Sequence, residues 1–288
     1  MDTYIHSYRD VAEASLVAQT ELEFATWLAR RGTKIICHKG RHWMQAFPGF
    51  YATVHPLARL GVHEATRPAA LCWGFRTSLR DQDADQANGS LPLHLLSDID
   101  TYTWQAISSR YRNKLRNLRK QVRVVELHKP DLLLDQGYEI LRSANTRNNY
   151  GRVTRPAIYR KYVEKYYATG HGLVIGGLLD GKLIGYLTGH AVGKTAYVDD
   201  LFLDSQHLRT NISLGLFFEW VQICRRTVAI REVVHGLHAR EAPGLCHYKD
   251  ELGLSMVHLP TRIWFAPMTG TIVKTLRPHA YYRLTGHD

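Results

Sequence analysis

The chain has 288 residues, 45% of them hydrophobic and 22% charged, which is typical of a globular protein with a sizeable core. No apolar run approaches the roughly 20 residues that cross a bilayer, and the N-terminus lacks a secretory pattern. We therefore expect a cytoplasmic protein without membrane insertion. The net charge of +11 predicts attraction to anions such as nucleic acid, phosphorylated carriers or acidic surfaces.

The first hundred residues show short elements separated by breaks. Apolar residues within 11–31 follow a helical spacing, and the predicted amphipathic helix ends at Gly32. The elements expected after it are strands over 33–38, around 50–54 and over 69–76, and a surface loop over 81–90.

The most basic predicted helix lies within 109–123. It has seven basic residues and no acidic one between Arg110 and Arg123, while apolar residues recur at three- and four-residue steps on a packed face. The charge run is either a solvated face or a surface that binds an anion. The second reading explains better why no carboxylate relieves the repulsion between like charges. Arg110, Tyr111 and Arg112 are candidate substrate-binding residues.

A strand over 122–127 and a helix over 131–145 lead into a polar, aromatic and basic segment. Arg147, Asn149 and Tyr150 in this segment are further candidates for binding an anionic substrate. A helix over 156–168 follows, and we interpret its four tyrosines as packing residues.

The C-terminal half has the clearest order of elements. Two apolar strands within 172–189 are joined by Asp180-Gly181, a strong hairpin signal. The elements predicted after them are a strand over 195–203, a polar turn, a helix over 212–226, a strand over 231–235, a helix over 241–252 and a strand over 255–265.

The polar turn resembles the pyrophosphate motif of the GNAT N-acyltransferases, V-D-P-x-Y-R-G-x-G-I-G-x-x-L. Asp204, Ile212 and Leu216 match the motif by type and His207 takes the place of its tyrosine. Leu208, Arg209, Asn211 and Ser213 replace the motif's arginine and its three glycines, which allow close approach of backbone to phosphate. The resemblance implies a donor site formed by His207, Leu208, Arg209, Thr210, Asn211, Ile212 and Ser213.

The predicted helix over 241–252 resembles the last GNAT helix, but Lys249 stands at the position where that helix usually has the tyrosine that acts as general acid. An aromatic-Lys pair before x-x-x-Gly is similar to the Fem-type peptidoglycan aminoacyltransferases and related FemAB-like proteins. This resemblance implies an α/β (α+β) fold with a GNAT-like mixed sheet flanked by helices. It also implies a degenerate N-terminal lobe (1–101), a basic connecting helix (102–125) and a complete C-terminal acyltransferase lobe (126–288).

Acyl transfer to an amine needs an anion site for the donor, stabilisation of the oxyanion and a base. The resemblance implies that Lys249 stabilises the developing negative charge. Asp199, Asp200 and His238 are alternative bases. Because neighbouring side chains on a strand point to opposite faces, we expect only one of the two aspartates to face the cleft.

These patterns predict an N-acyltransferase that uses acyl-CoA (acetyl-CoA), with aminoacyl-tRNA as the alternative donor. The acceptor is expected to be an amine of an anionic small molecule or cell-envelope precursor. The rival interpretation is a non-catalytic module that binds RNA or another polyanion. No metal is predicted, because the histidines are scattered and the four cysteines form no CxxC pair.

Overall fold

The computed structural model describes residues 4–148, 154–168 and 170–287. Their contacts divide the chain into two compact units. Unit 1 comprises residues 1–18 and 96–233, and unit 2 comprises residues 19–95 and 234–288. The division falls inside strands β2 (Ala18–Gln19), β7 (Gly89–Leu96) and β12 (Glu232–Leu237).

Unit 1 is built on five neighbouring strands in the order β1-β8-β9-β10-β11, all antiparallel. The β9–β10 hairpin turns at Asp180 and Gly181, which both have positive φ, as a type I′ turn requires. The predicted hairpin is therefore confirmed. The strand bounds are β1 (Arg9–Asp10), β8 (Val122–Glu126), β9 (Leu173–Leu179), β10 (Lys182–Val192) and β11 (Thr195–Leu203).

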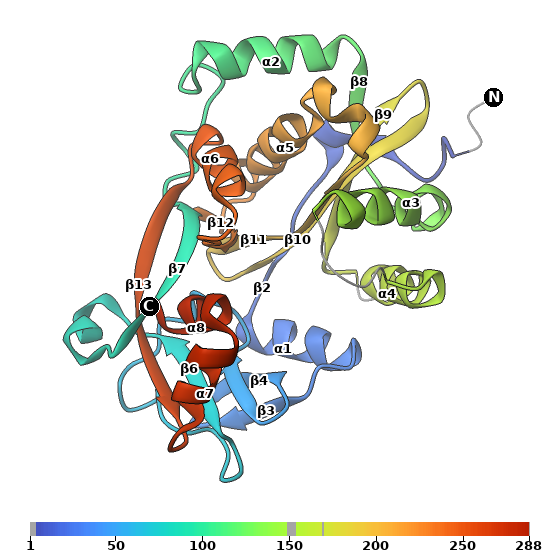
Figure 1. Cartoon of the computed structure of the whole chain (residues 1–288). Coiled ribbons are helices and arrows are strands. Elements are labelled where there is room, and N and C mark those ends of the chain that lie inside the picture. Colours follow the sequence, from blue (N-terminus) through green and yellow to red (C-terminus); the bar gives the residue numbers. More distant parts are fainter. Residues whose placement is uncertain (1–3, 149–153, 169, 288) are drawn as a thin grey trace. The chain divides into compact units, whose positions relative to one another are not determined.

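Helices pack on both faces of these strands. Figure 1 draws α3 (Asp131–Arg147) and α4 (Pro156–Ala168) on one side, and α5 (Ile212–Arg226) on the other with α2 (Ser109–Arg119) beside it. The α2–α5 packing is fixed by the Tyr111 hydroxyl, which donates to the Leu214 carbonyl at 2.9 Å. The two short 3-10 helices of unit 1 are η1 (Val11–Glu13) and η3 (Ser205–Thr210).

Unit 2 has its own strands, in the order β12-β7-β13-β6-β5-β4-β3, and the β5–β6 pair is parallel. Its core includes Trp43, Leu60 and Leu79, all almost fully buried. Its other strands are β3 (Ile35–His38), β4 (Arg41–Phe47), β5 (Phe50–Thr53), β6 (Gly74–Ser78), β7 (Gly89–Leu96) and β13 (Ser255–Phe265). Its helices are α1 (Glu21–Arg30), η2 (Asp81–Gln86), α6 (Pro243–Glu251), α7 (Thr269–Leu276) and α8 (Pro278–Thr285).

The mixed sheet with flanking helices confirms the predicted fold class. The strand expected over 69–76 begins only at Gly74, and the stretch 81–90 holds η2 and the start of β7 rather than a loop throughout. The lobe borders 1–101, 102–125 and 126–288 follow sequence motifs and stay a prediction. Within the described residues, no helix has the length and apolar character needed to cross a membrane.

Candidate functional site

A β-bulge in unit 1 places two carboxylates together. Thr188 of β10 pairs with Asp200 of β11 and Gly189 pairs with Val198, so Asp199 is an extra residue in its strand. Such a bulge bends the strand locally and interrupts the strict alternation of side chains. Bulges of this kind occur often beside active sites.

Both carboxylates contact tyrosines of α4. The Tyr162 hydroxyl donates to Asp200 at 2.9 Å, and the Tyr166 hydroxyl lies 3.4 Å from Asp199 while donating to the Gly189 carbonyl at 2.8 Å. The prediction that the two aspartates point to opposite faces is therefore wrong, because the bulge turns both toward α4.

Sequence reasoning missed His190, the residue that holds Asp199. The Nδ1 atom of His190 lies 2.8 Å and 3.0 Å from the two Asp199 carboxylate oxygens. His190 is buried and stacks on Tyr197 with ring centroids 5.2 Å apart, whereas Asp199 remains exposed. A carboxylate held by a buried imidazole and still open to solvent is a suitable proton acceptor.

The loop after β11 lies where the pyrophosphate motif is expected, but its residues differ from those of the motif. Asn211 ends η3 with φ 60° and ψ 29°, a left-handed conformation that asparagine tolerates in place of the motif's glycine. The turn into α5 is thereby kept. Ile212 is fully buried against the sheet, where its side chain lies near Gly177.

A carboxylate of the chain already occupies this turn. Asp204 accepts the backbone N–H of Gln206 at 3.2 Å, receives the Ser143 hydroxyl at 3.2 Å and lies 2.8 Å from His207 Nδ1. Burial raises the pKa of Asp204, but these hydrogen bonds outweigh it and the net pKa is below its usual value. The Ser205 N–H donates to Ser143. An incoming phosphate would therefore meet a negative charge, and the N–H groups of Ser205 and Gln206 are already in use.

An open cavity of about 1110 Å³ adjoins this loop. Arg147, a predicted substrate-binding residue, lines it but donates to the Leu203 carbonyl at 3.1 Å and to Ser205 at 2.9 Å, so it also fixes the loop. Both basic and acidic side chains line the cavity, including Arg142, Lys182, Asp135, Glu139, Asp180 and Asp204. The cavity thus lacks a strong preference for anions.

Some of the side chains of the basic helix α2 make contacts within unit 1. Arg112 donates to the carbonyls of Ile107 and Gln105 at 2.6 Å and 2.9 Å, and Tyr111 is buried. Both side chains therefore stabilise unit 1, and this burial argues against the predicted substrate-binding role of Tyr111. Arg110 is exposed. The predicted residues Asn149 and Tyr150 lie outside the described residues.

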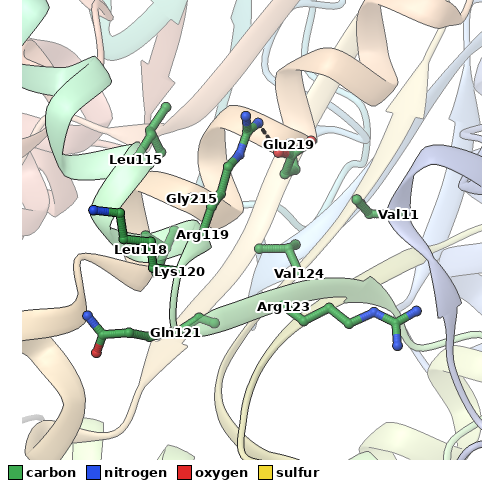
Figure 2. A pocket seen from close by; sticks show the side chains of 11 residues that line it. Val11, Leu115, Leu118, Arg119, Lys120, Gln121, Arg123, Val124, Gly215 and Glu219 are labelled. Carbon is green, nitrogen blue, oxygen red and sulfur yellow. Dashed lines mark hydrogen bonds and ion pairs between the residues drawn. The ribbon is translucent and has the colours of Figure 1, made fainter.

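The end of α2 and the start of β8 form a pocket of about 480 Å³ with a positive lining (Figure 2). Its basic residues are Arg119, Lys120 and Arg123, and its one acidic residue, Glu219, pairs with Arg119 at 2.8 Å. Arg119 also lies over the Trp104 ring at 4.9 Å. Lys120 and Arg123 leave the lining with net positive charge.

In unit 2, Lys249 is buried on α6 and is 4% exposed. Its Nζ donates to the Leu237 carbonyl at 3.1 Å, just after Gly236 turns the chain with a positive φ of 72°. Burial lowers the pKa of Lys249 to about 8. The candidate cation is therefore held inside the protein near the end of β12 rather than on a solvated helix face.

Besides burial, the charge of Lys249 acts on three histidines and lowers the pKa of each. Burial, together with the nearby charge of Lys249, lowers the pKa of His94 to about 4 and that of His235 to about 3. The pKa of His238 is also lowered, mainly by burial, and its Nδ1 lies 2.8 Å from the Tyr282 hydroxyl. His238, a predicted base, is thus neutral and hydrogen-bonded.

The predicted catalytic residues fall into two groups. Asp199 and Asp200 lie together in unit 1, and Lys249 and His238 lie together in unit 2. Among the described residues, the side chains that could hold a metal ion are His94, His238 and Cys246.

No family model and no curated protein matches the sequence. Several solved structures are nevertheless similar to the protein. The chain is similar to FemX (TM-score 0.61, 9% identity, 96% of this chain and 97% of that one). It is also similar to the C-terminal DUF2156 domain of a protein from Agrobacterium fabrum described as a lysylphosphatidylglycerol synthetase (TM-score 0.57, 12% identity, 92% of each chain).

A conserved protein of unknown function from Bacteroides thetaiotaomicron shows a comparable likeness (TM-score 0.58, 10% identity, 89% of this chain and 98% of that one). The chain therefore shares the fold of FemX and of the DUF2156 domain. At identities this low the common property is the fold, and the predicted resemblance is confirmed at that level.

Proposed function

We propose that the protein is an acyltransferase that moves an acyl or aminoacyl group from an activated ester or thioester to an amine. The observation that supports this proposal best is the Asp199–His190 pair at the β11 bulge, in a chain with the FemAB-like fold. The likeness to FemX and to the DUF2156 domain covers 96% and 92% of the chain, and thus parts of both units.

Each candidate group has a defined chemical task. The acceptor amine attacks the acyl carbonyl carbon, the carrier oxygen or sulfur leaves, and the amine proton passes to the Asp199–His190 pair. Negative charge develops on the carbonyl oxygen and needs a donor or a cation to stabilise it. The resemblance implies that Lys249 of unit 2 is this cation, and that role stays a prediction. Tyr162 positions Asp200 through its hydroxyl group, and the Tyr166 hydroxyl lies 3.4 Å from Asp199.

For the donor we favour aminoacyl-tRNA over acyl-CoA. In the loop that would grip the CoA pyrophosphate, Asp204 and Ser143 already accept backbone N–H groups, and bulkier residues replace the motif's glycines. The positive pocket with Lys120 and Arg123 suits a polyanion. One similar structure is named for the synthesis of an aminoacylated lipid.

The acceptor class follows from charge alone. Net charge of +11 and the exposed Arg110 favour an amine on an anionic molecule, such as a cell-envelope precursor.

Binding to the two donors distinguishes them. We expect bulk tRNA, deacylated or aminoacylated, to bind with a steep salt dependence. Millimolar CoA or acetyl-CoA should leave the melting temperature unchanged. Lys120→Glu and Arg123→Glu should each lower the salt slope by about one or more. The control is Lys129→Glu, which reverses an exposed charge of unit 1 that does not line the pocket. Stabilisation by CoA without tRNA binding would reverse the order of the donors.

Turnover tests the enzyme itself. Purified protein is incubated with radiolabelled aminoacyl-tRNA or acetyl-CoA and a panel of amines, and the transfer of label is followed. Asp199→Asn should lower the transfer rate about 100-fold, whereas Asp85→Asn, at an exposed position of η2, should leave it unchanged. Tight tRNA binding together with no transfer from either donor would favour the non-catalytic polyanion-binding interpretation instead.

A further inference from the structure

Three potential metal ligands converge in unit 2 from distant parts of the chain. His94 lies on β7, His238 follows β12 and Cys246 lies on α6. One ligand atom from each lies within 4.8 Å of those of the other two. The sequence spacing concealed this group, because 144 residues separate His94 from His238.

His94 is the observation that points to a ligand. It is 1% exposed, yet neither of its ring nitrogens has a hydrogen-bond partner among the residues that the structure describes. A buried imidazole without a partner costs about 1–3 kcal/mol, so such groups are rare in proteins unless they serve a ligand. Its ring centroid lies 5.6 Å from that of His238.

The other two side chains are arranged as metal ligands commonly are. His238 Nδ1 lies 2.8 Å from the Tyr282 hydroxyl. When Nδ1 carries the proton and donates to Tyr282, the Nε2 lone pair is available to a metal, and the ring orientation is fixed. Cys246 is a free, partly buried cysteine whose sulfur lies 3.5 Å from the Ala239 carbonyl.

We propose that His94, His238 and Cys246 form a site for Zn²⁺ or a similar borderline divalent ion. Two imidazole nitrogens and one thiolate are a donor set that selects such ions over Mg²⁺ and Ca²⁺. Zinc–nitrogen and zinc–sulfur bonds of about 2.0–2.3 Å bring tetrahedral ligands to about 3.5 Å from each other. Small side-chain rotations close the remaining gap. Three protein ligands leave the fourth position for water or another small ligand.

Binding has a defined proton balance. The Cys246 S–H bond breaks, a metal–sulfur bond forms, and one proton passes to the buffer. The bound ion also ties α6, through Cys246, to β7 and to the segment after β12. Zinc should therefore raise the melting temperature of the whole chain in proportion to its occupancy.

Cobalt substitution tests the site without any assay of activity. We expect the chelator-treated protein to take up one equivalent of Co²⁺ with a thiolate-to-cobalt charge-transfer band, one released proton, and displacement of cobalt by Zn²⁺. Cys246→Ser should abolish the charge-transfer band and weaken zinc binding at least about 100-fold. Cys37→Ser, which changes an exposed cysteine of the same unit, should change neither property.

Two further variants keep the test decisive. His94→Gln should weaken zinc binding as strongly as Cys246→Ser. Tyr282→Phe, which removes only the partner of His238, should weaken it by about 10–100-fold. If Co²⁺ gives no thiolate band, or if Cys246→Ser binds zinc as tightly as the unmodified protein, the site is refuted. Weak uptake of several ions by exposed histidines would also refute it.

Discussion

The burial of Lys249 predicts that this lysine destabilises the fold. Its pKa falls from 10.5 to about 8, mainly by burial. This difference corresponds to about 3 kcal/mol, at about 1.4 kcal/mol for each pH unit. Lys249→Met keeps the shape of the side chain but loses the hydrogen bond to Leu237, which is worth about 1 kcal/mol. The variant should therefore be more stable than the parent protein by about 2 kcal/mol at pH 7.

The sign of the pH dependence gives a second check. Because the folded pKa lies below the unfolded pKa, the cost of the buried cation is complete below pH 8 and disappears as the pH rises toward 10.5. Urea unfolding of the metal-free protein should thus show the advantage of Lys249→Met shrinking between these pH values. Lys34→Met, at an exposed lysine, should change stability by less than about 0.5 kcal/mol.

A functional lysine and a structural lysine give opposite results in this experiment. If Lys249→Met gains stability but loses transfer activity, the cation is retained for chemistry despite its cost to folding. If the variant is less stable than the parent at pH 7, the side chain serves the fold, and its proposed role in stabilising the oxyanion is wrong.

Three other predictions concern the carboxylate pair, its strand and a buried histidine. Asp199→Asn should lower turnover about 100-fold with an unchanged melting temperature, and Asp200→Asn should lower it less; steady-state transfer rates check both. Gly189→Ala should lower the free energy of unfolding by about 3 kcal/mol, since the new Cβ would lie 2.4 Å from the Tyr197 carbonyl and 2.5 Å from the Trp220 ring. Gly244→Ala, with open space around it, should be nearly neutral, and urea unfolding measures both variants. The folded pKa of His235, about 3, lies below its unfolded value of 6.5, so this residue accounts for a loss of about 3 kcal/mol of stability as the pH drops from 6.5 to 4.5. In the same assay His235→Phe should lose about that much less than the parent protein, while the loss caused by His94, with a pKa of about 4, remains.

Local signals predicted the second half of the fold well. The Asp180-Gly181 turn has the positive φ angles that its residues favour, and the predicted helix over 212–226 has the bounds of α5. These elements are encoded by turn chemistry and by apolar periodicity. The strand β7 was missed because its residues are buried on both faces and do not alternate, and Pro92 within it argues against a strand. The helices α7 and α8 were not predicted either.

The candidate site was only partly predictable, because its geometry depends on irregular backbone. Lys249 and Asp199 could be named from the sequence, since motif positions are local. Period-2 alternation could not anticipate that Asp199 is an extra residue in its strand. Nor could it identify His190 as the partner of Asp199, because that contact depends on the pairing of β10 with β11.

Net charge proves a weaker guide to function than the contacts that each cation makes. Along α2, Arg112 donates to backbone carbonyls and Arg119 pairs with Glu219 and lies over Trp104, so these two charges are used within the fold. A phosphate competing for them would have to replace existing interactions. The pocket at the end of α2 differs, because Lys120 and Arg123 add charge that its single carboxylate does not balance. If a polyanion binds unit 1, reversal of these two charges should therefore weaken binding more than reversal at Arg112.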